Sequence, residues 1–223
     1  MTSVVLYLVR HGAIISVAGK SFIGQLEAPL SEEGVEQAWA LRNWLEPVTF
    51  SRVLASDLSR SRRTAMIVAG CSADRVDALP ALREINLGEW EGITFDEIRR
   101  RFPEDYAARG RDMENWRPPG GESFSDCRAR AQTALAEIVA ASHGNVLLAG
   151  HAGVNRLILC SVLGIPVKNL HCIGQNYGCV NVIEFGPERT RVQLLNYTPL
   201  PRSESTAHVQ ASGRSHHAYD LSR

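Results

Sequence analysis

An apolar run from residue 4 to residue 9 stops abruptly at Arg10, His11 and Gly12. Such a run of aliphatic, aromatic and β-branched residues predicts a buried strand, and the glycine after it allows the chain to turn away tightly. Open α/β sheets bind their ligands at the carboxyl ends of their strands. The sequence therefore predicts that this strand delivers a cation and a titratable imidazole to a binding edge.

A second predicted strand, at residues 145–149, ends in a similar way. It is followed by residues 150–153, Gly-His-Ala-Gly, so a histidine again stands beside small residues at the carboxyl end of a strand. If the two strands are neighbours in one sheet, His11 and His151 face each other across a single crevice. A lone histidine is usually an ordinary surface or core residue. Because the same placement occurs twice, a functional role for both histidines is the better interpretation.

Short strands alternate with amphipathic helices along the rest of the chain. Further strands are predicted at 52–55, 179–185 and 191–197, and helices at 31–45, 56–69, 95–102, 124–141 and 154–163. Ser31 is the expected N-cap of the first helix, and Ser56 and Asp57 offer cap oxygens to the second. Pro103 is expected to end the third. This alternation predicts an α/β fold with three layers, α/β/α, around a mostly parallel central sheet.

Composition restricts the function classes. In 223 residues, 24 basic and 24 acidic side chains cancel, so no global field favours nucleic acid or an anionic membrane as a partner. The five cysteines are odd in number and form no CxxC pair, which argues against a disulfide framework or a zinc site and favours a reducing, cytoplasmic location. Residues 1–198 are expected to form the domain and residues 199–223 a polar, mobile tail.

Phosphoryl transfer needs a nucleophile, cations for the phosphate oxygens, and an acid for the leaving oxygen. His11 is the candidate nucleophile, with a backbone carbonyl fixing its tautomer. Arg10 and Arg60 present planar forks that match phosphate oxygens, and His151 adds a donor. Glu84 is the candidate proton donor. On pattern alone, Arg60 can equally belong to the solvated face of a helix. For Glu84, the pattern favours a catalytic role no more than an ordinary structural one.

A rival phosphate-binding motif lies in the same region. Gly19, Lys20 and Ser21 resemble the end of a P-loop, but that motif requires a glycine five residues before Gly19, where Ile14 stands. The chain also contains no GxGxxG pattern, so a dinucleotide site is unsupported. The sequence therefore argues against a nucleoside triphosphatase or a dinucleotide enzyme.

In order along the chain, these motifs resemble those of the histidine phosphatase superfamily, which has the phosphoglycerate mutase-like fold. The resemblance covers residues 4–197 and rests on Leu8-Val9-Arg10-His11-Gly12, Pro29-Leu30-Ser31, Ser56-Asp57-Leu58-Ser59-Arg60, Leu82-Arg83-Glu84, Gly120-Gly121-Glu122-Ser123 and Gly150-His151-Ala152-Gly153. It implies a phosphohistidine on His11, a phosphate cradle of Arg10, Arg60 and His151, and Glu84 as general acid and base. It implies no metal and no cofactor.

The chain departs from the family pattern directly after the first histidine. Many members continue with Glu and Thr and carry an Asn three residues later, whereas this chain has Ala13, Ile14 and Val17. Backbone groups near Gly24 and at Ala152 are therefore additional candidates for phosphate binding. The stretch 22–31 is similar to the α-ribazole phosphatase branch of the family.

Three functions remain open on the sequence. The leading one is a metal-independent phosphomonoesterase acting on a small phosphate ester, with α-ribazole 5'-phosphate as a candidate. The second is a phosphoglycerate mutase-type isomerase, which the short segment 93–119 and the departures after Gly12 disfavour. The third is a phosphate-binding module without turnover, which is ranked last because every expected catalytic position is occupied. A homodimer is one open candidate for the oligomeric state.

Overall fold

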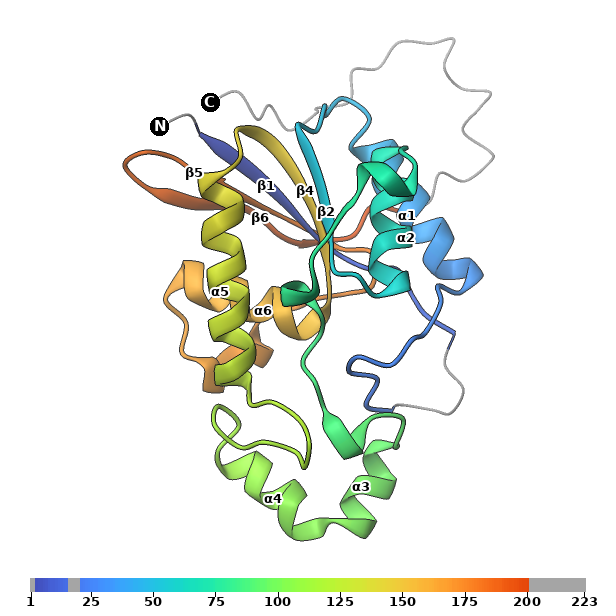
Figure 1. The fold of residues 1–223 in the computed structure, drawn as a ribbon, viewed down its shortest axis with the longest axis vertical. Helices are drawn as coiled ribbons and strands as arrows, with labels where there is room; N and C mark the ends of the chain where they lie inside the picture. The colour runs from blue at the N-terminus through green and yellow to red at the C-terminus, as the bar shows by residue number, and fades with distance from the viewer. Residues whose placement is uncertain (1–2, 16–20, 201–223) are drawn as a thin grey trace.

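A central six-stranded sheet carries the rest of the structure, a computed structural model that describes residues 3–15 and 21–200 (Figure 1). The strands are β1 (Val4–Arg10), β2 (Arg52–Ala55), β3 (Asp77–Ala78), β4 (Gly144–Gly150), β5 (Val180–Phe185) and β6 (Thr190–Tyr197). Their order is β3-β2-β4-β1-β5-β6. The pairs β3–β2, β2–β4 and β4–β1 are parallel, and only the last two pairs are antiparallel. The predicted mostly parallel sheet is confirmed.

Helices cover both faces of this sheet, as the three-layer prediction requires (Figure 1). The α-helices are α1 (Glu32–Trp44), α2 (Ser59–Ala69), α3 (Phe95–Arg101), α4 (Pro103–Arg111), α5 (Phe124–Ala140) and α6 (Ala152–Leu163), and the short 3-10 helices are η1 (Ala73–Arg75), η2 (Pro80–Leu82), η3 (Gly88–Trp90) and η4 (Val167–Cys172). Leu6 and Leu8 of β1 pack in the core under α5 and α6. Tyr7 and Val9 pack on the other side with α1 and α2. Since both faces of β1 are buried, its sequence is apolar throughout rather than alternating.

The first helix begins as predicted, but the second does not. Ser31 caps α1, since its hydroxyl accepts from the amide of Gly34. The N-cap of α2 is Leu58, which has no side-chain cap, so the prediction that Ser56 or Asp57 caps this helix is wrong. The reason is competition: Ser56 is paired with His151, and Asp57 forms a bidentate ion pair with Arg83.

The prediction for Pro103 is confirmed but incomplete. Pro103 ends α3 but at once opens α4, because proline is well tolerated in the first turn of a helix, where its missing N–H has no intrahelical partner. Together α3 and α4 project from the body of the sheet (Figure 1). The predicted mobile tail, from 201 to 223, lies outside the described residues, as do Gly19 and Lys20 of the rejected motif.

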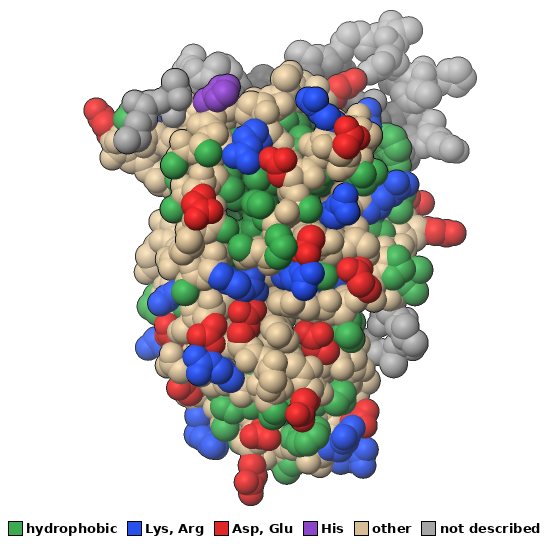
Figure 2. Space-filling view, viewed as in Figure 1, with side chains coloured by type: hydrophobic (Ala, Val, Ile, Leu, Met, Phe, Trp, Pro, Cys, Tyr) green, Lys and Arg blue, Asp and Glu red, His purple; other side chains and the backbone are tan. Residues whose placement is uncertain are grey.

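The surface shows no single sign of charge on the face in Figure 2, where Lys and Arg side chains lie interspersed with Asp and Glu. This distribution agrees with the cancelling totals in the sequence. Across residues 3–15 and 21–200, the helices are all too short or too polar to cross a bilayer.

Candidate active site

The two sequence-predicted histidines meet at one edge of the sheet. In the parallel pairing of β1 with β4, Arg10 stands opposite Gly150, so each histidine follows directly after its strand. The amide of His11 donates to the carbonyl of Gly150 at 3.1 Å, and the two imidazole centroids are 5.1 Å apart. The expectation that His11 and His151 face each other is therefore confirmed.

His11 is held in one tautomer by its own backbone neighbour. Its Nδ1 lies 2.8 Å from the carbonyl oxygen of Gly12, which can only accept, so the ring proton sits on Nδ1 and Nε2 keeps its lone pair. Burial, followed by the nearby charges of Arg10 and Arg60, lowers the pKa of His11 well below its ordinary value. The side chain is a neutral imidazole with a free nucleophilic nitrogen.

His151 is held by its other nitrogen. Its Nε2 lies 2.6 Å from the hydroxyl oxygen of Ser56, which also accepts from the amide of Leu58 at 3.3 Å. When the Ser56 hydroxyl donates to Nε2, the imidazole proton lies on Nδ1, an atom that is buried and has no partner. Burial above all, together with the nearby charges of Arg60 and Arg10, lowers the pKa of His151 well below its ordinary value.

Arg60 lies in the first turn of α2, as predicted, and is only 1% exposed. Its two terminal nitrogens donate to the carbonyls of Leu26 and Gly24, both at 2.7 Å, while its Nε is buried without a partner. The sequence predicted only that the Arg60 guanidinium binds phosphate. In the structure it also fastens the loop before α1, and Gly24 contributes a carbonyl to that contact.

Arg10 is held from two sides by residues that the sequence analysis did not single out. One terminal nitrogen donates to the carbonyl of Gln175 at 2.5 Å, and the guanidinium lies 3.7 Å from the centroid of the Tyr177 ring. The Tyr177 ring is also 5.6 Å from that of His11. The Nε of Arg10 is buried without a partner. No motif marks Tyr177 in the sequence, because the stacking depends on a distant loop.

Glu84 is placed at the N-terminus of α6. Its carboxylate accepts from the amides of Gly153 at 3.0 Å, Val154 at 3.1 Å and Ile85 at 3.0 Å. A Cβ on Gly153 would lie only 2.5 Å from the carboxylate, so glycine at this position admits the side chain. The N-terminus of α6 thus holds the carboxylate of the predicted proton donor, and Glu84 lines the same cavity as His11.

These side chains open on a common cavity of about 640 Å³. Its lining includes six of the seven predicted site residues: Arg10, His11, Gly24, Arg60, Glu84 and Ala152. His151 does not line the cavity and is fully buried against His11. No group of three His, Cys, Asp or Glu side chains within residues 3–15 and 21–200 is arranged to hold a metal ion.

Comparisons with known proteins agree with this arrangement. The model of the histidine phosphatase superfamily (branch 1) matches residues 6–198. The adenosylcobalamin/alpha-ribazole phosphatase of Salmonella typhimurium is 31% identical over 200 residues, which is 89% of this chain and 99% of the relative. The glucosyl-3-phosphoglycerate phosphatase of Mycolicibacterium vanbaalenii is 34% identical over 177 residues, 76% of this chain and 78% of the relative.

Solved structures give the same result. The crystal structure of the alpha-ribazole phosphatase from Shigella flexneri superposes with a TM-score of 0.79 at 27% identity, over 86% of this chain and 96% of that chain. This chain belongs to the histidine phosphatase superfamily. It is a phosphoric monoester hydrolase with the phosphoglycerate mutase-like fold, acting on a small phosphorylated metabolite.

Proposed function

We propose that this chain hydrolyses phosphate monoesters through a covalent phosphate on Nε2 of His11. The observation that carries the proposal is a set of three buried nitrogen atoms without partners: Arg10 Nε, Arg60 Nε and His151 Nδ1. Buried donors of this kind are normally paired, so three of them on residues around one free imidazole nitrogen match the oxygens of a phosphoryl group. The cavity of about 640 Å³ leaves space for the rest of the ester.

The steps follow from this placement. Nε2 of His11 attacks phosphorus, the ester P–O bond breaks, and the leaving oxygen takes the proton from the carboxyl group of Glu84. The negative charge on the phosphoryl oxygens is stabilised by Arg10, Arg60 and His151. A water molecule then attacks phosphorus and gives its proton to the Glu84 carboxylate. The P–N bond breaks, and inorganic phosphate leaves with His11 neutral again.

The leaving group is proposed from the apolar part of the cavity lining. Its side chains include Ile14, Phe22, Ile23, Leu87 and Phe95. Such a surface suits a flat aromatic group better than a polyhydroxylated sugar, because burying unpaired hydroxyls is unfavourable. We therefore favour α-ribazole 5'-phosphate, which carries an aromatic base, over a glucosylated phosphoglycerate. The chain's apolar Ile14, at the position of the usual threonine, adds to this surface.

A cytoplasmic location is part of the same proposal. All five cysteines, at positions 71, 127, 160, 172 and 179, are unpaired, and three of them are buried. Unpaired thiols are typical of a reducing compartment. The oligomeric state, with a homodimer as one candidate, is left to measurement.

The direct test is hydrolysis of p-nitrophenyl phosphate in EDTA by the wild-type chain and by His11→Ala. We expect activity in EDTA for the wild type and a loss of at least about 10³-fold for the variant, which lacks the nucleophile. Equal rates, or activity only after metal is added, would rule out the proposal. A second assay compares α-ribazole 5'-phosphate with glucosyl-3-phosphoglycerate, and a preference for the latter would refute the leaving-group assignment.

A further inference from the structure

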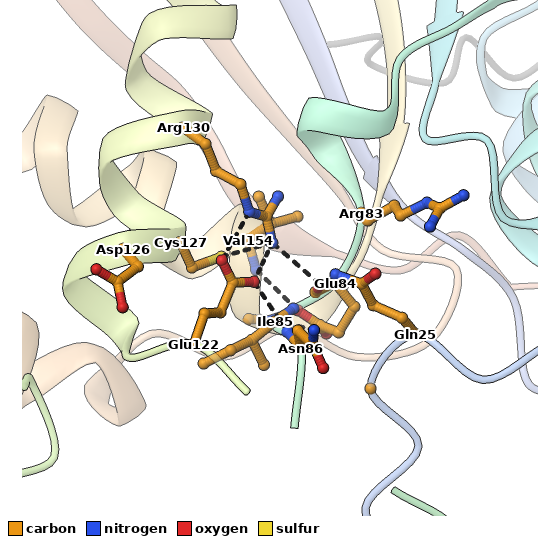
Figure 3. Close-up of polar contacts among 12 residues, drawn as sticks. Gln25, Arg83, Glu84, Ile85, Asn86, Glu122, Asp126, Cys127, Arg130 and Val154 are labelled. Carbon is orange, nitrogen blue, oxygen red and sulfur yellow. Dashed lines mark hydrogen bonds and ion pairs between the residues drawn. The ribbon is translucent and has the colours of Figure 1, made fainter. Parts of the chain in front are cut away.

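Arg130, on α5, contacts the segment that carries Glu84 at two backbone carbonyls (Figure 3). Its Nη1 donates to the carbonyl of Ala81 at 2.7 Å, and its Nη2 donates to the carbonyl of Glu84 at 3.0 Å. The same Glu84 carbonyl accepts from the side-chain amide of Gln25 at 3.0 Å. The backbone of the proposed proton donor is therefore fixed from α5 and from the loop that precedes α1.

Glu122 completes this contact from the segment just before α5. It forms a bidentate pair with Arg130, with distances of 2.6 Å and 3.0 Å. Glu122 also forms two hydrogen bonds with the backbone of Asn86. The Glu122 carboxylate accepts from the Asn86 backbone amide, and the Glu122 backbone amide donates to the Asn86 carbonyl, both at 2.9 Å. The pair thus holds the backbone on both sides of Glu84.

The pair is sheltered from solvent, and Arg130 keeps its charge. The two side chains are 24% and 17% exposed, and neither lines the cavity, so they do not contact the phosphate ester themselves. Burial lowers the pKa of Arg130, but the hydrogen bonds to Glu122 and the nearby acidic groups outweigh it, so the pKa is raised overall. Bidentate geometry of this kind fixes direction as well as distance.

We infer that the Glu122–Arg130 pair positions Glu84 for proton transfer to the leaving oxygen. This inference rests on the proposed function, because it assigns these two residues a role through the general acid of that reaction. A displacement of the carboxyl group by 1 Å is enough to slow a step that depends on it. The two residues are positioning residues, and their effect reaches the substrate only through Glu84.

This role has a signature that loss of stability lacks. A good leaving group such as p-nitrophenolate departs without much help from an acid, whereas an alkoxide needs its proton during bond cleavage. Mispositioning Glu84 should therefore reduce hydrolysis of an alkyl phosphate far more than hydrolysis of p-nitrophenyl phosphate. A general loss of folded enzyme would reduce both rates equally.

The test measures kcat/KM for p-nitrophenyl phosphate and butyl phosphate in wild type, Arg130→Gln, Glu122→Gln and the control Arg117→Gln. Arg117 forms a bidentate pair with Asp126 on the same helix but contacts no residue of the Glu84 segment. We expect Arg130→Gln and Glu122→Gln to lose about tenfold more activity on butyl phosphate than on p-nitrophenyl phosphate, a fraction of the usual general-acid contribution of about 10²–10⁴. Arg117→Gln should change neither rate. Equal losses on both substrates, or no loss, would overturn the inference.

A double variant separates this inference from the proposed function. In a Glu84→Gln background, Arg130→Gln should have no additional effect on butyl phosphate, because the group it positions is already disabled. A full additional effect would refute the positioning role while leaving Glu84 as the acid. If Glu84→Gln itself shows no leaving-group dependence, the proposed function fails instead. Should Arg130→Gln not fold, Arg130→Lys carries the same test, since an ammonium cannot reproduce the bidentate pair.

Discussion

His11 and His151 occupy equivalent places in the sheet but are held by opposite ring nitrogens. Both follow directly after neighbouring parallel strands, and both are buried. His11 is bound at Nδ1 by a backbone carbonyl, whereas His151 is bound at Nε2 by the hydroxyl of Ser56. His11 therefore offers a lone pair at Nε2, and His151 offers an N–H at Nδ1 when the Ser56 hydroxyl donates to its Nε2. The same residue type gains two roles from its hydrogen-bond partner alone.

The comparison predicts unequal losses when each imidazole is removed. His151→Ala should lower kcat by about 10²–10³-fold, the usual effect of deleting one donor to a developing charge. Unlike His11→Ala, it should still form a phosphoenzyme, which mass spectrometry after an alkaline quench can detect as a mass increase, because the P–N bond survives in alkali. If His151→Ala forms no phosphoenzyme while His11→Ala does, the two roles are reversed.

A smaller loss is expected when Ser56 no longer fixes the His151 ring. Ser56→Ala removes one hydrogen bond, about 0.5–1.5 kcal/mol, so kcat should fall up to about tenfold. Ser56→Thr keeps the hydroxyl and serves as the control. Nitrogen NMR of the histidines should show the His151 proton on Nδ1 in wild type and a mixture of tautomers in Ser56→Ala. An unchanged spectrum would show that Ser56 does not set the tautomer.

Substituting Tyr177 should have a smaller effect than substituting Ser56, and this effect should reach the phosphate position through Arg10. Tyr177→Leu removes the ring beneath the guanidinium, a contact worth about 0.5–2 kcal/mol, so the Kd for vanadate should rise about 2- to 30-fold. Tyr177→Phe keeps the ring and should bind vanadate like the wild type. If Phe and Leu weaken binding equally, the hydroxyl rather than the stacking is responsible.

Both histidines also make stability depend on pH. The folded chain keeps them neutral, because burial lowers their pKa, whereas the unfolded chain protonates them below about pH 6.5. The unfolded state then binds more protons, so the free energy of unfolding should decrease as pH falls below about 6.5. Urea titrations between about pH 5 and 7.5 should show this decrease in wild type and a smaller one in a His11→Gln, His151→Gln double variant. An identical decrease would contradict the buried neutral assignment.

The sequence was most informative where local pattern decides the structure. The apolar run before Arg10 predicted a buried strand, and the predicted cap at Ser31 is present, because each depends on a few adjacent residues. The meeting of His11 and His151 was also predictable, since parallel strands end at the same edge of a sheet.

The rest depends on contacts that leave no local pattern. The fork of Arg60 binds the backbone carbonyls of Gly24 and Leu26, and any residue type can supply a carbonyl. Ser56 was predicted to cap a helix because its side-chain type fits a cap, but a histidine on another strand competes for its hydroxyl. Sequence reasoning ranks such alternatives poorly, because the deciding partner is far away in the chain.

Arg60 has a consequence for how this enzyme can respond to ligands. The same guanidinium fastens the loop at Gly24 and Leu26 and faces the proposed phosphate position with its unpaired Nε. Two equilibria that share one side chain are linked, and the linkage is reciprocal. Product phosphate should therefore favour the conformation in which Arg60 holds Gly24 and Leu26, and a leaving group that favours this conformation should increase the affinity for phosphate.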